Sequence, residues 1–360
     1  MKKKKKRILL TTAAALLSAA LCLSGCAGRP DPASENAGPP AGESVISQED
    51  TTASAAMIAS EDTAVADTAA APEDTAAAYP VTFLDSLNRE VTVSAPQRVA
   101  VMIGSFADIW CLAGGKESLV ASAHDTWTYF DLDLNDSVID IGNTKEPNLE
   151  RLAASEPDFI IASSNTEADV KLLDTFEAMG MNVAYFQVSN FNEYLHMLDI
   201  CTRITGERDR YHQYGELLQE QIDRAKAAAD GSSPTVLYVR ASGSSCKVKN
   251  SRGSVLGEML HDLGCVNIAD SADSLLEDLN MESILAADPD YIFVVLQGAD
   301  KAAVTETLEK HLISHPAWQS LTAVQEGRYH ILDDRLYNLK PNARWGDAYE
   351  NLAGILYPGT

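Results

Sequence analysis

The chain is poor in positive charge and in histidine. It has 28 lysine and arginine residues against 52 aspartate and glutamate residues, a formal net charge of −24 at pH 7. A surface of this charge repels nucleic acid and anionic lipid, which excludes nucleic-acid binding. The seven histidines are scattered apart from one HxxxH spacing, His311 and His315, and no histidine-rich loop occurs. We expect no site for a bare metal ion.

Motifs for catalysis are also missing. The sequence contains no GxSxG, no HExxH, no GxGxxG after a predicted strand and no cluster of carboxylates in a cleft-forming motif. We therefore expect no catalytic residues and no cofactor, and we do not expect an enzyme. An extracellular enzyme is kept as an alternative, which turnover of a substrate would favour.

Cysteines are few and show no metal-ligand spacing. No CxxC motif occurs. Two of the six lie near the N-terminus, and the spacing does not pair the other four, for which buried thiols are the favoured interpretation and disulfides stay open: Cys111, Cys201, Cys246 and Cys265.

The N-terminus predicts export. A basic segment from Lys2 to Arg7 precedes an apolar stretch, Ile8–Leu23, and small residues follow, so residues 1–25 have the order of a secretory signal. The stretch is marginal as a membrane span, which needs about 20 apolar residues. Leu23-Ser24-Gly25-Cys26 resembles the lipobox of bacterial lipoproteins, which implies lipidation of Cys26 and an extracytoplasmic protein anchored to the cell membrane. The alternative is an ordinary signal with a chance cysteine.

Residues 26–78 are predicted to be a disordered acidic tether. They are rich in alanine, threonine, serine, proline and acidic residues, with Arg29 as the only basic residue. The triplet Glu-Asp-Thr recurs at Glu49, Glu61 and Glu73. Large apolar side chains are so rare that no core offsets the ordering entropy. Removal of the signal, with its six basic residues, would bring the net charge to about −30. Repulsion between the negative charges of residues 26–78 would keep this segment extended.

The remaining chain contains an internal repeat. Residues 149–161 align without gaps on residues 281–293, and both predict a short helix, a Pro-Asp turn and a buried strand, Phe159–Ala162 and Tyr291–Leu296. Helices also begin at Gly104-Ser105 and Gly253-Ser254, after strand-like runs. Strands that alternate with helices predict parallel sheets. We expect an α/β fold with two Rossmann-like lobes, residues 79–189 and 232–360, and a ligand cleft between them.

Residues 190–231 are predicted to be a helical connection between the lobes. A helical pattern runs from Asn190 to Thr205, Gly206 interrupts it, and a second pattern runs from Glu207 to Ala229. Twenty-three helical residues span roughly 35 Å. A rod of this length predicts a cleft that hinges little.

These features resemble the periplasmic-binding-protein family that serves iron-siderophore, haem and cobalamin ABC importers, the helical-backbone class III. The resemblance runs from about Val81 to Pro358 and depends on ordered segments: Phe83–Val93, Pro96–Val99, Ile141-Gly142, Pro147–Glu150, Glu156–Asp158, Gly257–Leu260 with Leu263-Gly264, His315–Trp318 and Gly327–His330. It implies a monomer that captures a solute outside the membrane and delivers it to a permease and its ATPase.

The ligand implied by the resemblance is an iron complex, a ferric siderophore first and haem second, with cobalamin or another corrinoid third. A lipoprotein that only senses a ligand is a further alternative. Glu150 and Glu282 occupy equivalent places in the repeat, each at the start of a short helix. The resemblance implies that they dock onto arginines of the permease; the alternative is that they only complement their helix dipoles.

The N-terminal lobe is predicted to contribute Ser105, His124, Trp127 and Tyr129 to the ligand site. Ser105 alternatively caps its helix. The other three lie in a polar loop, residues 123–136, whose aromatic side chains suit stacking on a large planar or catecholate ligand; alternatively the loop packs on its own lobe. If the ligand is haem, His124 or Met102 is a candidate axial ligand.

The C-terminal lobe is predicted to contribute cations. We expect ligand contacts from Arg240, at the end of a buried strand, from Lys249, and from Tyr337, Lys340 and Arg344 in the segment before the last helix. In so acidic a chain, cations on the cleft favour an anionic ligand such as a ferric siderophore or a carboxylated tetrapyrrole. The alternative is that the lysines are ordinary solvated surface residues.

Overall fold

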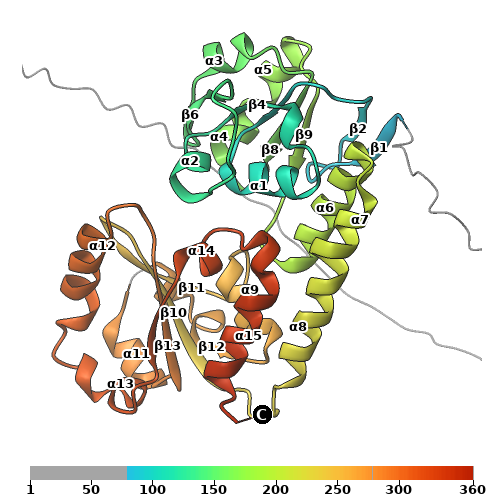
Figure 1. Ribbon diagram of the computed structural model, residues 1–360. Helices are drawn as coiled ribbons and strands as arrows, with labels where there is room; N and C mark the ends of the chain where they lie inside the picture. The colour runs from blue at the N-terminus through green and yellow to red at the C-terminus, as the bar shows by residue number, and fades with distance from the viewer. Residues whose placement is uncertain (1–78, 278, 360) are drawn as a thin grey trace, which may run out of the picture. The chain divides into compact units, whose positions relative to one another are not determined.

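A computed structural model describes residues 79–277 and 279–359 (Figure 1). The predicted signal, Cys26 and the predicted tether lie outside the described residues. Within the described part, no helix combines the length and the apolar character that crossing a membrane requires.

The N-terminal lobe is built on a parallel five-stranded sheet with the strand order β5-β4-β3-β8-β9. Val99, Ala100 and Val101 of the central strand are fully buried, as a strand covered on both faces requires. The elements of this lobe are β1 (Val81–Leu84), β2 (Glu90–Val93), β3 (Val99–Val101), α1 (Gly104–Leu112), η1 (Lys116–Ser118), β4 (Leu119–Ser122), α2 (Asp125–Tyr129), β5 (Ile139–Asp140), β6 (Gly142–Asn143), β7 (Glu146–Pro147), α3 (Leu149–Ala154), β8 (Phe159–Ser163), α4 (Glu167–Lys171), α5 (Leu173–Ala178) and β9 (Val183–Phe186).

The C-terminal lobe has its own sheet, with the order β11-β10-β13-β14 and β12 beside β10. Strands β12, β13 and β14 are parallel to their neighbours, whereas β11 is antiparallel to β10 and was not predicted. The elements are β10 (Thr235–Ala241), β11 (Cys246–Lys249), α9 (Val255–Asp262), β12 (Val266–Asn267), η3 (Ile268–Asp270), α10 (Asp273–Glu277), α11 (Met281–Ala287), β13 (Tyr291–Leu296), α12 (Lys301–Leu308), η4 (Glu309–Ile313), η5 (Trp318–Ser320), α13 (Thr322–Gln325), β14 (Tyr329–Leu332), α14 (Asp334–Tyr337), η6 (Asn342–Arg344) and α15 (Trp345–Leu356).

The two copies of the internal repeat also make equivalent hydrogen bonds. Asn148 and Asn280 cap helices α3 and α11 with their side-chain oxygens. In the turn that follows, Asp158 accepts hydrogen bonds from the backbone N–H groups of Gln97 and Arg98. Its repeat equivalent, Asp290, accepts from the backbone N–H and the hydroxyl of Thr235. Each carboxylate thus fastens its turn to the start of the first strand of its own sheet. The two separate sheets confirm the predicted α/β fold of two lobes.

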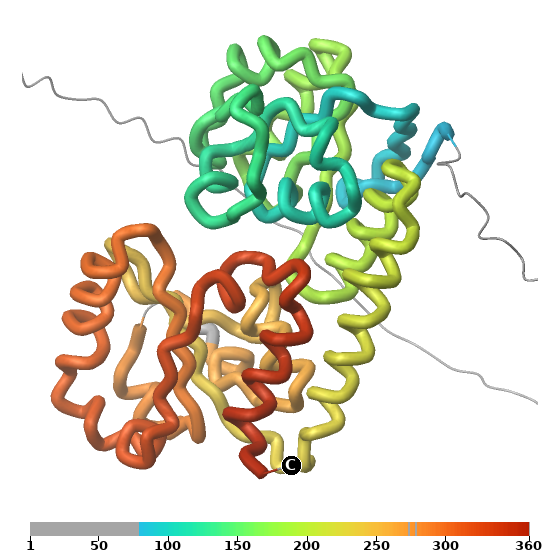
Figure 2. The backbone as a smooth tube through the Cα atoms, in the orientation of Figure 1, coloured from blue at the N-terminus to red at the C-terminus, as the bar shows by residue number. Residues whose placement is uncertain are grey.

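Helices connect the lobes. Helix α6 (Phe191–Thr205) ends at Gly206, which has φ of 81°, and the helical run resumes through α7 (Arg208–Tyr211), η2 (His212–Glu216) and α8 (Leu217–Ala227). The predicted second helix therefore forms, although η2 is wound as a π-helix. The C-terminal helix α15 packs along α8, as the backbone trace shows (Figure 2).

The junction between the lobes is apolar and aromatic. Trp345, at the start of α15, lies 5.9 Å from the ring of Phe191 and 6.2 Å from that of Tyr194, both on α6. All three are buried in a hydrophobic core that includes residues of both sheets. Because interiors are packed to crystal-like density, a continuous core resists rearrangement at this junction. This packing supports the prediction that the cleft hinges little.

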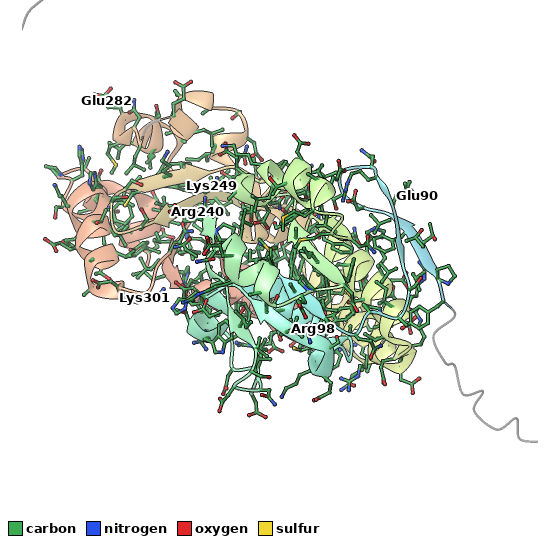
Figure 3. The ribbon with its side chains drawn as sticks, turned by 90° about the horizontal axis from the view of Figure 1, so that it is seen from above. Glu90, Arg98, Arg240, Lys249, Glu282 and Lys301 are labelled. Atoms are coloured by element: carbon green, nitrogen blue, oxygen red, sulfur yellow. The ribbon has the colours of Figure 1, made fainter. Side chains whose placement is uncertain are left out.

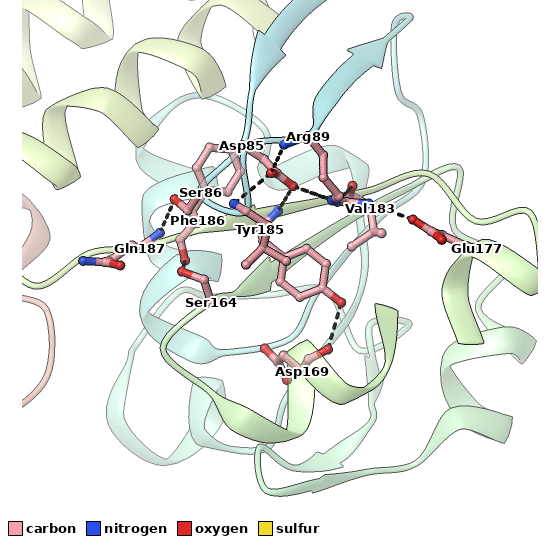
Figure 4. A network of polar contacts seen from close by, with 11 residues as sticks. Asp85, Ser86, Arg89, Ser164, Asp169, Glu177, Val183, Tyr185, Phe186 and Gln187 are labelled. Carbon is pink, nitrogen blue, oxygen red and sulfur yellow. Dashed lines mark hydrogen bonds and ion pairs between the residues drawn. The ribbon is translucent and has the colours of Figure 1, made fainter. Parts of the chain in front are cut away.

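A buried ion pair fastens the β1–β2 hairpin to strand β9 (Figure 4). The side chain of Asp85 is fully buried, and its Oδ2 lies 2.7 Å from Nη2 of Arg89. Asp85 also accepts hydrogen bonds from the backbone N–H groups of Leu87, Arg89 and Tyr185. The guanidinium of Arg89 in turn donates to the carbonyl of Val183. With both charges satisfied, the pair specifies how the hairpin sits on the sheet.

Gly104 permits the close approach of α2 to α1. A Cβ added to Gly104 would lie 2.7 Å from the backbone nitrogen of Thr126 and 2.9 Å from the carbonyl carbon of Asp125. The carboxylate of Asp125 accepts a hydrogen bond from the Gly104 N–H at 2.9 Å. The absence of a side chain therefore sets the position of α2, which carries Trp127 and Tyr129.

We predict that Gly104→Ala destabilises the protein by about 1–3 kcal/mol, because the methyl group meets backbone that cannot give way locally. The matched control is Gly354→Ala in α15, where an added Cβ meets nothing within 4 Å. That change removes backbone freedom from the unfolded chain and should stabilise by about 0.5–1 kcal/mol. Urea unfolding measures both free energies. Equal effects of the two substitutions would contradict the account of α2.

Asp169 predicts a pH dependence of stability. Burial raises the pKa of its carboxyl to about 7, the charge of Asp125 adds to this, and a hydrogen bond from the Ser163 N–H opposes it. The unfolded chain loses this proton near pH 4 and the folded chain only near pH 7, so this contribution to stability falls as pH rises between those values.

We therefore expect Asp169→Asn to gain stability relative to the native protein by an amount on the order of a few kcal/mol between pH 4 and pH 8. Unfolding free energies across this range measure the difference. Asp174→Asn, an exposed change on α5, is the control and should show no such trend. A difference for Asp169→Asn that stays constant with pH would refute this assignment.

Candidate functional site

A polar pocket lies between residues of the two lobes, with a volume of about 130 Å³. The N-terminal lobe contributes Asn165, Val188 and Ser189, which follow strands β8 and β9. The C-terminal lobe contributes side chains from β10, from the start of α9 and from residues 337–340. The pocket is thus formed where strands β8, β9 and β10 end, the edge at which α/β sheets bind ligands.

Positive charge gathers at this pocket. Arg240 and Lys340 line it, and no aspartate or glutamate of the described residues does. Lys249 lies on β11 beside β10, near Arg240 (Figure 3). Among the described residues, none of these three cations has a carboxylate within 4 Å, and the guanidinium of Arg240 donates only to Oδ1 of Asn338, at 3.3 Å.

The pKa values of Lys249 and Lys340 are both lowered by this environment. Burial lowers the pKa of Lys249, and the neighbouring charges of Arg240 and Lys247 lower it further. Burial also lowers the pKa of Lys340, against the opposing charges of Asp125 and Glu193. An anion bound among these side chains would relieve the repulsion and the lost hydration together. The geometry therefore suits an anionic group.

Two other residues nominated from the C-terminal lobe have partners of their own. Tyr337 lines the pocket but is buried, and its hydroxyl donates to the carbonyl of Ala348 at 3.1 Å. Burial raises the pKa of this phenol to about 12. Arg344 lies 3.4 Å from the carboxylate of Asp347, is half exposed and is not among the residues that line the pocket. Ligand contact by either residue stays a prediction.

The nominated aromatic residues of the N-terminal lobe lie on a short helix. Residues 125–129 form α2, so the prediction of a loop over 123–136 was wrong in this part. Trp127 is 42% exposed, whereas Tyr129 is partly buried. The pKa of Tyr129 is raised by burial and by the charge of Asp334, which belongs to the other lobe. The charge of Asp334 therefore reaches Tyr129 across the two lobes, and the ring of Trp127 on the same short helix is exposed.

His124 stands just before α2. It is exposed, and its Nδ1 lies 2.7 Å from Oδ2 of Asp140. This contact favours the tautomer with the proton on Nδ1 and leaves Nε2 as the basic nitrogen. Met102, the other candidate axial haem ligand, is fully buried in the core of the N-terminal lobe, so its nomination was wrong. In the described residues, no group of three or more histidine, cysteine or acidic side chains is arranged to hold a metal ion.

Ser105 lies at a contact between the lobes. It does not cap α1, because Ile103 is the N-cap residue, and the buried Ser105 Oγ has no hydrogen-bond partner among the described residues. Its carbonyl accepts a hydrogen bond from Nδ2 of Asn342 at 2.9 Å, and the same amide donates to Oδ2 of Asp108 at 2.7 Å. Asn342 is fully buried, so this contact fixes the end of the pocket segment against α1.

Glu150 and Glu282 are both exposed, in the first turns of α3 and α11. The caps of these helices are Asn148 and Asn280, so neither glutamate is needed for a capping hydrogen bond. Neither makes an ion pair among the described residues. Their side chains are therefore free to meet a partner.

The four cysteines that the structure describes are all free thiols.

Sequence reasoning missed several residues of the pocket. Tyr238, Ser254 and Asn338 line it, together with Asn165 and Ser189. Tyr238 lies in an apolar strand whose pattern predicts core residues. Such a pattern does not show whether the hydroxyl of a tyrosine is paired. Asn165 and Ser189 carried a usable signal, because polar residues directly after buried parallel strands lie at the ligand edge of a sheet.

Comparison with known proteins agrees with this architecture. A family model described as "Periplasmic binding protein" matches residues 99–336. The Fe(3+)-citrate-binding protein YfmC of Bacillus subtilis is 26% identical over 258 residues, which cover 68% of this chain and 76% of the relative. The iron-uptake system-binding protein of the same organism is 24% identical over 229 residues, 61% of this chain and 67% of the relative.

A solved structure has the same fold. IsdE of Staphylococcus aureus, complexed with heme, superposes with a TM-score of 0.61 at 16% sequence identity. The match covers 72% of this chain and 98% of IsdE.

Proposed function

Because the chain belongs to the periplasmic binding protein family, we propose that it is the substrate-binding protein of an ABC importer for an anionic iron complex. A ferric siderophore is the first candidate ligand and haem the second. The single observation that carries this proposal is the group of unpaired cations, Arg240, Lys249 and Lys340, at a pocket between two lobes. The names of the relatives supply the iron chemistry.

The charge of the cleft ranks the candidate ligands. The chain carries 52 acidic against 28 basic residues, yet no carboxylate lines the pocket. Ferric complexes of carboxylate or catecholate chelators are anionic, and haem carries two propionates, so both would pair with these cations. A corrinoid offers less negative charge to the cluster and ranks third. The exposed ring of Trp127 suits contact with a planar part of either favoured ligand.

The N-terminal sequence indicates where the protein is located. We propose that Cys26 is lipidated and that the protein is held on the outer side of the cell membrane as a monomer, with residues 26–78 as the tether. The basic segment, apolar stretch and Leu-Ser-Gly-Cys order support this.

The ligand class is tested by binding to the full chain purified in detergent. Trp127 is 42% exposed, whereas Trp110, Trp318 and Trp345 are at most 2% exposed, so ligand contact should quench the emission of one tryptophan selectively. We expect quenching and a raised melting temperature with at least one of ferric citrate, a ferric catecholate, a ferric hydroxamate and haemin, and none with cobalamin or free metal ions. Trp127→Phe should remove most of the quenching and keep the thermal shift. A wild-type protein that responds to no iron complex or haemin would refute the ligand class.

Glu150 and Glu282 are proposed to dock onto the permease. They occupy equivalent exposed positions, one in each lobe, and need no role within the fold. A pair of carboxylates carried on two rigid lobes would register the protein on a two-fold symmetric transporter.

We predict that Glu150→Arg with Glu282→Arg reduces uptake of the bound complex at least about tenfold and leaves ligand affinity unchanged, because opposed charges become like charges at the permease. The matched control is Glu117→Arg with Glu306→Arg, which makes the same charge change at an exposed glutamate of each lobe. Uptake of radioactive iron by cells and ligand titration measure the two properties. Equal uptake by both double variants would contradict the proposal that Glu150 and Glu282 dock onto the permease.

A further inference from the structure

One wall of the pocket carries a buried hydroxyl with no partner. Tyr238, on the central strand β10, is fully buried and lines the pocket, yet its hydroxyl makes no hydrogen bond among the described residues. Buried polar groups are nearly always paired, so an orphan hydroxyl on a residue that lines a pocket marks a place where a water or a ligand group can bind.

A second orphan hydroxyl belongs to another residue that lines the same pocket. Ser254 stands at the N-cap of α9 (Val255–Asp262), but its Oγ caps nothing and has no partner, although the residue is nearly buried. Gly253, Ser254 and Val255 all line the pocket, so the start of this eight-residue helix borders it. The partial positive charge of a helix N-terminus favours an anion at this place.

The donors around the pocket match one kind of group. Tyr238 and Ser254 can each donate a hydroxyl hydrogen, and Arg240 adds a guanidinium whose hydrogen bond to Asn338 is long, at 3.3 Å. Lys340 adds a second cation, and no aspartate or glutamate of the described residues lines the pocket. A carboxylate has two acceptor oxygens that together take several such bonds, and charge-assisted bonds of this kind are the strong ones.

The size of the pocket limits what enters it. Its volume is about 130 Å³. Sites that enclose a whole drug-sized ligand measure about 300–1,000 Å³, so this pocket takes one arm of a larger molecule and not a complete ferric complex. The bulk of the complex would remain outside this pocket.

We propose that the hydroxyls of Tyr238 and Ser254, with the guanidinium of Arg240, hold a carboxylate arm of the iron complex, so that the protein selects ferric complexes with a free carboxylate over those without one. This inference rests on the proposed function and adds the chemical class of the ligand. A free carboxylate anion without iron has the same chemistry, and the experiment separates the two sources.

The test is calorimetric titration of the detergent-purified full chain with ferric citrate, with iron-free citrate and with a ferric tris-catecholate that has no carboxylate. Tyr238→Phe should weaken binding of ferric citrate at least about tenfold, the effect of one hydrogen bond to a charged group. Ser254→Ala should act in the same direction. Binding of the catecholate, whether weak or absent, should not change. The melting temperature of ligand-free Tyr238→Phe should not fall, because the deleted hydroxyl has no partner in the protein.

Tyr329→Phe is the matched control. Its hydroxyl is also a buried orphan, but it lies against Trp318 and away from this pocket, so its removal should leave all three titrations unchanged.

The outcomes separate the two proposals. Equal affinity of the native protein and Tyr238→Phe for ferric citrate would overturn the carboxylate site. A native protein that binds the catecholate and not ferric citrate would also overturn it, while keeping the proposed function. A native protein that binds iron-free citrate through Tyr238 and no iron complex would overturn the proposed function and keep the site. Binding of none of the three probes would overturn the carboxylate site, and it would overturn the proposed function as well if a ferric hydroxamate and haemin also fail to bind.

Discussion

The ligand site depends on three cations that form no ion pair within the described part of the protein. Arg240, Lys249 and Lys340 lie partly buried at the meeting of two lobes, in a chain with nearly twice as many acidic as basic residues. Desolvated cations without a carboxylate in direct contact are costly, and the lowered pKa values of both lysines express that cost. A binding protein can retain such an arrangement because a bound anion offsets it.

The lobes hold this charge in place because they share a junction of aromatic side chains. Trp345 packs against Phe191 and Tyr194, and the amide of Asn342 joins the pocket segment to α1 of the other lobe. Helix α15 runs along α8, so the last helix of the chain braces the connection. We expect a cleft made in this way to be largely formed before the ligand arrives, so that little binding energy is spent on closing it. Selectivity then has to come from side chains already in position, which is the role argued for Tyr238 and Ser254.

Much of this fold could be predicted from the sequence because it is a repeated unit with strong local signals. The Pro-Asp turns at 157–158 and 289–290, the apolar strands after them and the break at Gly206 all formed as expected. Strand β11 was missed because Cys-Lys-Val-Lys is short and alternates with charge, as an antiparallel edge strand does. The candidate site was predicted less well. Periodicity marks a residue as buried but does not say whether its polar atom is paired, so Tyr238 was not nominated. Met102 was nominated although it is fully buried in the core.

The central claim is that an anionic iron complex sits between the lobes against these cations. The most direct measurement is an anomalous difference map, at the iron edge, from crystals grown with ferric citrate. The account predicts one strong iron peak in the cleft, with a carboxylate of the chelator in contact with Arg240 and the hydroxyl of Tyr238. A peak elsewhere on the protein would contradict it, and so would a cleft without iron at saturation with ferric citrate and with each of the other iron complexes.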